Sequence, residues 1–235
     1  MKLTELDLIK GNIQYHPHLS PAAWDEWTML PEVHERLLDI AELFVDYLDL
    51  PDFDVDDVRL TGSLANFNWT KFSDFDLHIV TDYSKLDCDN IAEALYKAKK
   101  TIWNDNHDIT INGHDVELYI EDGAKPPHSA GMFSVLDNKW ISKPSYMPPT
   151  VDKRAVDRKV QVMMDLITKT VRSAQNPDDY KQTIEKVYRM RQNGLEAAGE
   201  FSTENLAFKV LRNLGYIDSL RKGYDRFVDA TLSLK

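Results

Sequence analysis

Residues 59–80 read RLTGSLANFNWTKFSDFDLHIV and contain a Gly-Ser turn followed by an Asp-x-Asp pair. Asp74 and Asp76 alternate with apolar residues, so a β-strand here presents both carboxylates on one face. Two ionised carboxylates on one strand face repel each other unless a cation lies between them. Because hard oxygen ligands suit Mg²⁺ or Mn²⁺, this stretch predicts a site for a divalent metal ion.

The Gly-Ser turn precedes the acidic pair. Residues 58–60 are typical of the end of a short strand, which leads through Thr61 into Gly62 and Ser63. Glycine lets the backbone turn sharply and approach a ligand closely. Backbone N–H groups in such a turn can bind phosphate oxygens, and a serine hydroxyl adds a further donor. Gly62 and Ser63 are therefore predicted to bind phosphate.

A third acid follows in a predicted hairpin. Two alternating stretches, residues 108–111 and 115–120, flank an Asn-Gly dipeptide, which is a strong hairpin signal. Glu117 lies between apolar neighbours on the second strand, so a neighbouring strand can bring it to the aspartate pair. Glu117 is the predicted third ligand, and Asp115 on the same strand face is the alternative.

These motifs resemble the signature of the polymerase β-type nucleotidyltransferase superfamily. The resemblance rests on Gly62-Ser63, a short helical spacer, the run Ser-Asp-Phe-Asp-Leu at residues 73–77 and the later acid Glu117, and it covers residues 55–120. It implies an α+β fold with a nucleotidyltransferase-like mixed β-sheet palm flanked by helices, followed by an all-helical C-terminal domain.

The same resemblance implies a set of roles. Gly62 and Ser63 would bind a triphosphate, while Asp74, Asp76 and Glu117 would hold two divalent metal ions, Mg²⁺ or Mn²⁺. A nucleoside monophosphate would pass from a nucleoside triphosphate such as ATP to a hydroxyl acceptor, with pyrophosphate as the leaving group. Glu117 is also placed to accept the proton of the acceptor hydroxyl.

Composition is that of an ordinary globular protein. The chain has 235 residues, 43% of them hydrophobic, and a net charge of −11. One cysteine, Cys88, excludes an intramolecular disulfide, and the N-terminal residues carry acids where a signal peptide would be apolar. No stretch reaches membrane-spanning length. These features predict a cytoplasmic location with no membrane partner.

Three parts are expected along the chain: an N-terminal extension (residues 1–30), the palm (31–150) and the helical domain (151–235). Ser20 and Pro21 predict the start of a short helix in the extension. Hydrophobic periodicity predicts further helices over residues 31–50 and 89–103 and four more after residue 151. In the second of these, the apolar positions Ile91, Leu95, Ala98 and Ile102 are expected to face the core, and Lys97, Lys99 and Lys100 to face solvent.

Charge divides unevenly between the parts. Residues 1–150 hold 12 basic and 27 acidic residues, whereas residues 151–235 hold 16 and 12. The superfamily commonly takes phosphate-binding cations from a helical partner domain, so the resemblance implies that basic residues here, Arg158 and Lys209, bind nucleotide. The acidic balance disfavours a long DNA track. The acceptor stays open among the 3′ end of a tRNA or other RNA, a protein and a small molecule.

Other classes of protein remain as alternatives. A metal-dependent glycosyltransferase would use Asp74 and Asp76 but would leave Gly62-Ser63 and Glu117 without a role. A nucleotide-binding sensor or interaction module without turnover would not need all three acids. A toxin or defence enzyme of the same fold would differ in acceptor and not in chemistry. A calcium loop and a zinc site are excluded by the spacing of the available ligands.

Overall fold

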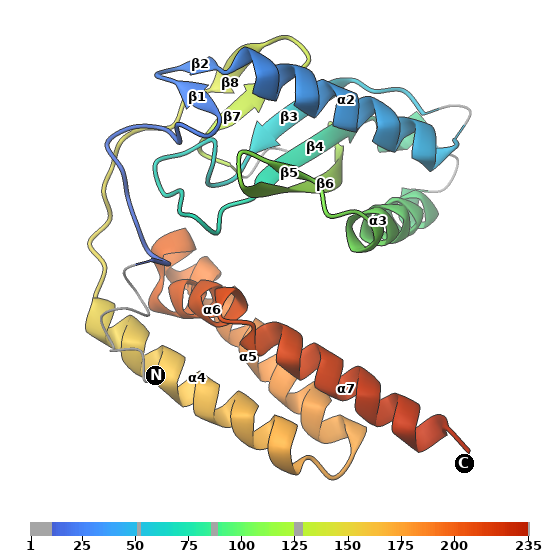
Figure 1. The fold of residues 1–235 in the computed structure, drawn as a ribbon, viewed down its shortest axis with the longest axis vertical. Coiled ribbons are helices and arrows are strands. Elements are labelled where there is room, and N and C mark those ends of the chain that lie inside the picture. The colour runs from blue at the N-terminus through green and yellow to red at the C-terminus, as the bar shows by residue number, and fades with distance from the viewer. Residues whose placement is uncertain (1–10, 51–52, 86–88, 125–128, 235) are drawn as a thin grey trace. The chain divides into compact units, whose positions relative to one another are not determined.

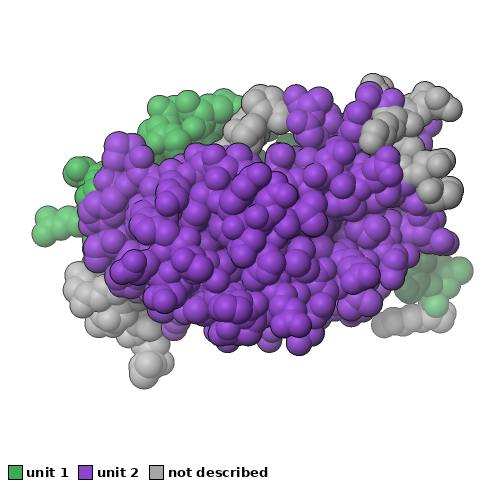
Figure 2. All heavy atoms as spheres, turned by 90° about the horizontal axis from the view of Figure 1, so that it is seen from above, with its two compact units in different colours: residues 1–13, 148–235 green, residues 14–147 purple. Residues whose placement is uncertain are grey.

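The computed structural model describes residues 11–50, 53–85, 89–124 and 129–234. The chain forms two compact units, residues 14–147 and residues 1–13 with 148–235 (Figure 2). Each unit has its own hydrophobic core. The first unit carries the sheet and the second is helical (Figure 1).

A six-stranded mixed sheet forms the centre of the first unit (Figure 1). Its order is β5-β6-β4-β3-β7-β8, in which β4 and β6 are parallel and the other neighbours are antiparallel. The β5–β6 turn has positive φ angles of 49° at Asn112 and 82° at Gly113, as the Asn-Gly signal predicts. A second hairpin is formed by β7 and β8. The strands are β3 (Asp57–Thr61), β4 (Phe75–Thr81), β5 (Thr110–Ile111), β6 (His114–Asp122), β7 (Met132–Ser134) and β8 (Lys139–Ser142).

Helix α2 (Pro31–Leu48) packs on the apolar face of this sheet (Figure 1). Its buried side chains recur at helical spacing, as predicted, and meet the residues of β4 and β6 that alternate with the acids. Burial of this face leaves the polar residues of β4 and β6 on the opposite face of the sheet. The main contributors to the shared core are Leu37, Phe44, Phe75, Leu77 and Leu118.

Helix α3 (Asp89–Asn106) connects η1 (Tyr83–Lys85) to the β5–β6 hairpin and packs along β6. The prediction of which side faces the core was wrong. Ile91 and Ile102 are 67% and 50% exposed, whereas Tyr96 and Trp103 are buried. The large rings bury more apolar area than the aliphatic stripe and decide the orientation of the helix. Lys100, at i+4 from Tyr96, is thereby turned inward.

The second unit contains the four predicted helices. The Oδ1 atom of Asp152 caps α4, and Asn176 and Asp179 form a capping box at α5. Ser202 caps α6, and Gly215 lies just after the C-terminal end of that helix. These helices are α4 (Lys153–Ser173), α5 (Pro177–Ala198), α6 (Thr203–Asn213) and α7 (Tyr216–Leu232), with η2 (Gly199–Phe201) between α5 and α6. The predicted fold class, a mixed sheet flanked by helices and followed by a helical part, is confirmed.

Two local predictions were wrong. The helix expected from Ser20 ends after one turn, and its place is taken by two short strands, β1 (Trp24–Asp25) and β2 (Thr28–Met29). Glu26 has a φ of 52° in the turn between these two strands, and the indole of Trp24 donates a hydrogen bond to the carbonyl oxygen of Leu64. The helical spacer expected after Gly62 is a series of turns.

None of the described helices combines the length and the apolar composition that crossing a membrane requires.

Candidate functional site

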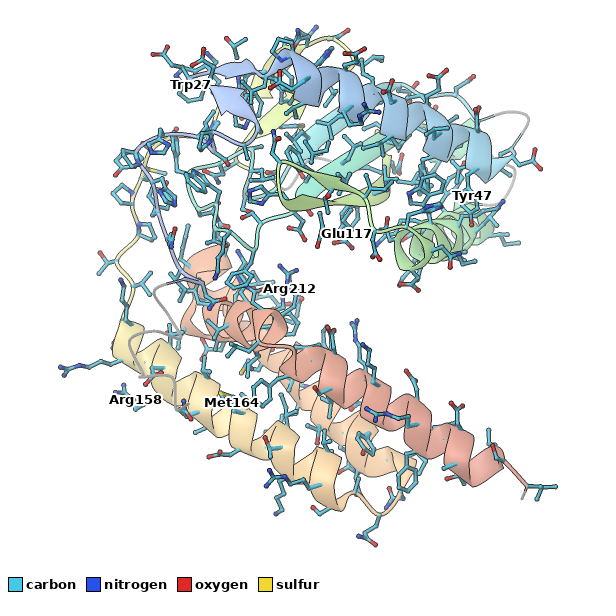
Figure 3. The ribbon with its side chains drawn as sticks, in the orientation of Figure 1. Trp27, Tyr47, Glu117, Arg158, Met164 and Arg212 are labelled. Carbon is cyan, nitrogen blue, oxygen red and sulfur yellow. The ribbon has the colours of Figure 1, made fainter. Side chains whose placement is uncertain are left out.

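Three carboxylates converge on the polar face of the sheet. Asp74 lies directly before β4, Asp76 lies on β4 and Glu117 lies on β6. Asp76 and Glu117 are register partners in the parallel β4–β6 pair, which places them side by side. One oxygen of each residue lies within 4.8 Å of the others, and all three side chains are half-buried. Figure 3 labels Glu117 on the side of the sheet away from α2.

The donor set fits a hard divalent cation. Three carboxylates supply only oxygen ligands, which Mg²⁺ and Mn²⁺ prefer over softer metals. Like charges at this separation raise the free energy of the cluster unless a cation compensates them. Asp74, Asp76 and Glu117 are therefore the residues that would hold a metal ion. Asp115, the alternative third acid, is exposed in register with Thr110 and lies outside the cluster.

The glycine turn lies against this cluster. Thr61 pairs with Asp76 in the antiparallel β3–β4 ladder, so the next residue, Gly62, meets the aspartate side chain. Gly62 has a φ of 74°, and a Cβ atom there would overlap Oδ2 of Asp76. Only glycine allows the backbone to come this close to the carboxylate.

Ser63 is tied to the loop before the first aspartate. Its hydroxyl donates to Oγ of Ser73 at 2.7 Å, and Ser73 Oγ accepts the backbone N–H of Thr70 at 2.9 Å. Ser73 immediately precedes Asp74, so these bonds hold the turn and the acidic pair in one arrangement. The role of Ser63 toward phosphate stays a prediction.

A row of side chains lies next to the acids on the same face of the sheet. His78 and Tyr119 are register partners, and their rings stack with centroids 4.8 Å apart. His78 also lies near Thr61, with Nε2 3.1 Å from Oγ1, and its Nδ1 lies 3.0 Å from Oε2 of Glu121. The row fixes Tyr119 beside the carboxylate cluster.

The carboxylate cluster affects the pKa of the Tyr119 phenol. Burial raises the pKa of its phenol well above the usual range, and the negative charges of Asp76 and Glu117 raise it further, as does a hydrogen bond with the Glu117 side chain. The phenol therefore stays protonated at neutral pH and can donate a hydrogen bond to Glu117.

Lys100 of α3 also lies at the cluster. Its Nζ lies 3.6 Å from Oε1 of Glu117 and 4.3 Å from the centroid of the Tyr119 ring. The expectation that Lys100 faces solvent was wrong, since only 21% of its side chain is exposed. Lys99 is also engaged, because its Nζ donates to the carbonyl oxygen of Leu48 at 2.9 Å. The sequence contained a signal for the orientation of Lys100. Two aromatic residues lie at helical spacing from it, Tyr96 four residues before and Trp103 three residues after.

The two predicted nucleotide-binding cations belong to the helical unit. Arg158 lies on α4 and is exposed (Figure 3), and Lys209 lies on α6 and is half-buried. Between them in sequence, Lys159 forms an ion pair with Glu204 at 3.1 Å. The assignment of Arg158 and Lys209 to nucleotide binding stays a prediction.

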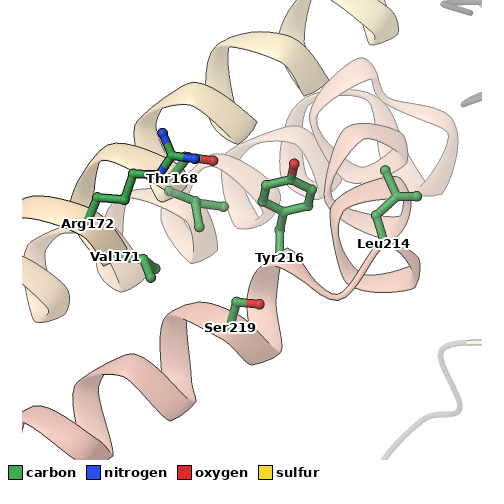
Figure 4. Close-up of a pocket in the computed structure, with 7 residues that line it drawn as sticks. Thr168, Val171, Arg172, Leu214, Tyr216 and Ser219 are labelled. Carbon is green, nitrogen blue, oxygen red and sulfur yellow. The ribbon is translucent and has the colours of Figure 1, made fainter. Parts of the chain in front are cut away.

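The helical unit also contains a hollow of about 350 Å³ (Figure 4). It offers one guanidinium and three hydroxyl groups above an apolar floor, and no carboxylate or imidazole. It therefore lacks the carboxylate and imidazole groups that a metal site would need. Its lining residues are Ile167, Thr168, Val171, Arg172, Leu214, Tyr216 and Ser219.

No protein-family model and no curated protein matches the chain. A search of solved structures finds similarity to the STING-associated CdnE c-di-GMP synthase from Capnocytophaga granulosa, at 12% identity, with a TM-score of 0.23 and coverage of 86% of this chain and 84% of that chain. This TM-score and identity are too low to support an inference about fold or activity. The geometry of the carboxylate cluster and the glycine turn is the basis for the function proposed below.

Proposed function

We propose that this protein is a metal-dependent nucleotidyltransferase, which transfers a nucleoside monophosphate from a nucleoside triphosphate to a hydroxyl acceptor. The observation that supports it is the contact between the Gly62 turn and a cluster of three carboxylates within 4.8 Å. An anion-binding turn next to a cation-binding cluster suits a triphosphate and its metal ions, since each compensates the charge of the other.

Each group has a defined task in this reaction. The acceptor hydroxyl oxygen forms a bond to the α-phosphorus, the bond from that phosphorus to the bridging oxygen breaks, and pyrophosphate leaves with the electron pair. Bound divalent metal ions would neutralise the charge that develops on the phosphate oxygens. Glu117 accepts the proton of the acceptor hydroxyl, and the Gly62-Ser63 turn orients the phosphate groups. Arg158 and Lys209 are proposed to contribute positive charge toward the triphosphate.

Calorimetric titration with each nucleoside triphosphate, with and without Mg²⁺, tests the binding step. We expect binding that requires the metal. Incubation with α-labelled nucleoside triphosphates and cell extract then tests transfer and shows whether label enters RNA, protein or a small molecule. Metal-independent binding, or none, would contradict the proposal, and turnover of a labelled nucleotide sugar instead would identify a glycosyltransferase.

The acids are tested by Asp74→Ala and Asp76→Ala. We expect each change to abolish transfer, because the metal ions lose a ligand. The melting temperature should stay the same or rise, because repulsion within the cluster falls. Asp115→Ala is the control: it removes an exposed acid of the neighbouring strand β6 that lies outside the cluster, and it should leave transfer unchanged. Full activity in either cluster variant would refute the site.

A further inference from the structure

Lys100 places a positive charge at the carboxylate cluster, which the proposed reaction needs for binding metal ions. Its ammonium is 3.6 Å from Oε1 of Glu117, and both side chains are partly shielded from bulk water, with 21% and 35% of their surfaces exposed. A pair at this degree of burial is less screened than a surface ion pair. The ammonium therefore lowers the repulsion that Glu117 experiences from Asp74 and Asp76.

The same ammonium also contacts the ring of Tyr119. The ring centroid is 4.3 Å from Nζ, within the range of a cation–π contact. The ring itself is fixed, because it stacks on His78 of the adjacent strand. Lysine carries its charge on a flexible four-carbon chain, so the ammonium can leave the carboxylate while it stays on the ring.

We propose that Lys100 is a positioning residue that pairs with Glu117 before a metal ion binds and moves away from that carboxylate when one does, while it keeps its contact with the Tyr119 ring. This inference rests on the metal site of the proposed function and goes beyond it, since it names the residue that sets the metal affinity of that site. The ammonium holds the carboxylate of Glu117 beside its neighbours and competes with the metal ion for it.

Competition follows from the charges. A divalent cation and an ammonium held a few ångströms apart repel each other, so Lys100 must yield for Glu117 to act as a ligand. Removing the ammonium therefore strengthens metal binding and leaves the metal-free cluster less stable. A purely structural ion pair would behave differently, because its loss would lower stability to the same extent with and without metal.

The test is Lys100→Met, with Mn²⁺ binding measured by calorimetry on the full chain in the absence of nucleotide. We expect Mn²⁺ to bind at least about tenfold more tightly than to the wild type, which is the effect of removing one unit charge about 6 Å from a divalent ion at a dielectric constant of about 80. The metal-free melting temperature should fall, and the rise on addition of Mn²⁺ should be larger than in the wild type.

Two further variants separate charge from shape. Lys100→Arg keeps the positive charge, and its guanidinium can bind a carboxylate through two hydrogen bonds, so it should bind Mn²⁺ no more tightly than the wild type does. Lys97→Met removes one charge from the exposed part of the same helix and should also behave as the wild type. If Lys100→Arg bound Mn²⁺ as tightly as Lys100→Met does, the charge would not be the cause and the proposal would be overturned.

The outcome also separates this inference from the proposed function. Wild-type protein that binds Mn²⁺, and loses it on Asp76→Ala, would support the metal site. Unchanged or weaker binding by Lys100→Met in that situation would overturn the role of Lys100 alone. Absence of Mn²⁺ binding by the wild type would overturn both.

Discussion

Gly62 has a left-handed backbone conformation and lies against the carboxylate of Asp76. Gly62→Ala therefore adds two costs: about 1 kcal/mol of backbone strain, and displacement of Asp76 by the new methyl group. We expect a lower melting temperature together with loss of Mn²⁺ binding and of transfer. Calorimetry and thermal unfolding of the same preparation measure both effects.

Gly113 provides the matched control for this prediction. Its φ is 82°, and a Cβ atom there would meet nothing within 4 Å. Gly113→Ala should lower the melting temperature by the backbone strain and leave Mn²⁺ binding intact. If the two alanine variants lost Mn²⁺ affinity equally, contact with Asp76 would not explain the need for glycine at position 62.

The acids of the cluster were predictable at the level of single residues because strand alternation is local. The side chains of a strand point alternately to its two faces, so the sequence around Asp76 and Glu117 indicates which face each occupies. Lys100 was not predictable in this way. Its contact with Glu117 depends on how α3 lies against β6, and the two residues are 17 positions apart across a helix end and a hairpin.

At the scale of elements, the orientation of α3 shows the limit of a periodic pattern. Two stripes at helical spacing compete on this helix, one aliphatic and one aromatic. The aromatic stripe faces the core: Tyr96 contacts Tyr83, and Trp103 contacts Phe44. Periodicity predicts that a helix is amphipathic, but tertiary packing decides between two stripes of similar hydrophobicity. For the strands, the side that faces the core was not ambiguous, because the side chains of a strand point to only two faces.

The ion pair between Lys159 and Glu204 connects α4 to α6. A hydrogen bond from the Lys159 ammonium lowers the pKa of Glu204 below its ordinary value of 4.5. A carboxyl with a lowered pKa contributes stability above its unfolded pKa, and this contribution is lost as the pH falls through the folded pKa. Lys159→Met should therefore lower the free energy of unfolding by about 0.5 kcal/mol at pH 7, and by less as the pH falls below 4.5.

Urea unfolding of the full chain across this pH range measures the difference. Lys181→Met is the control, since its partner Asp178 lies on the same helix and both side chains are more than half exposed. It should change stability little at any pH. A loss from Lys159→Met that stayed constant as the pH fell would show that the ion pair is not its source.

At the scale of the whole molecule, the two cores are separate. The sheet core draws on residues from Tyr15 to Trp140, and the helical core draws on Ile13 and on residues from Val151 to Phe227. The carboxylate cluster, the Gly62 turn, Tyr119 and Lys100 all belong to residues 14–147. Arg158 and Lys209 belong to the other unit. Metal binding and the proposed contribution of cations to triphosphate binding are thus assigned to different units and can be tested separately.

Residues 14–147 expressed alone should fold, because their core and sheet are complete within that range. We expect a cooperative thermal transition and Mn²⁺ affinity within about twofold of the full chain.

The affinity of the isolated unit for nucleoside triphosphate should fall. In the full chain, Arg158→Ala and Lys209→Ala should each weaken nucleotide binding about tenfold without changing Mn²⁺ binding, as loss of a charged hydrogen bond predicts. Full nucleotide affinity in the isolated unit would remove both cations from the site. Loss of Mn²⁺ binding in a folded fragment would mean that the cluster depends on the helical unit.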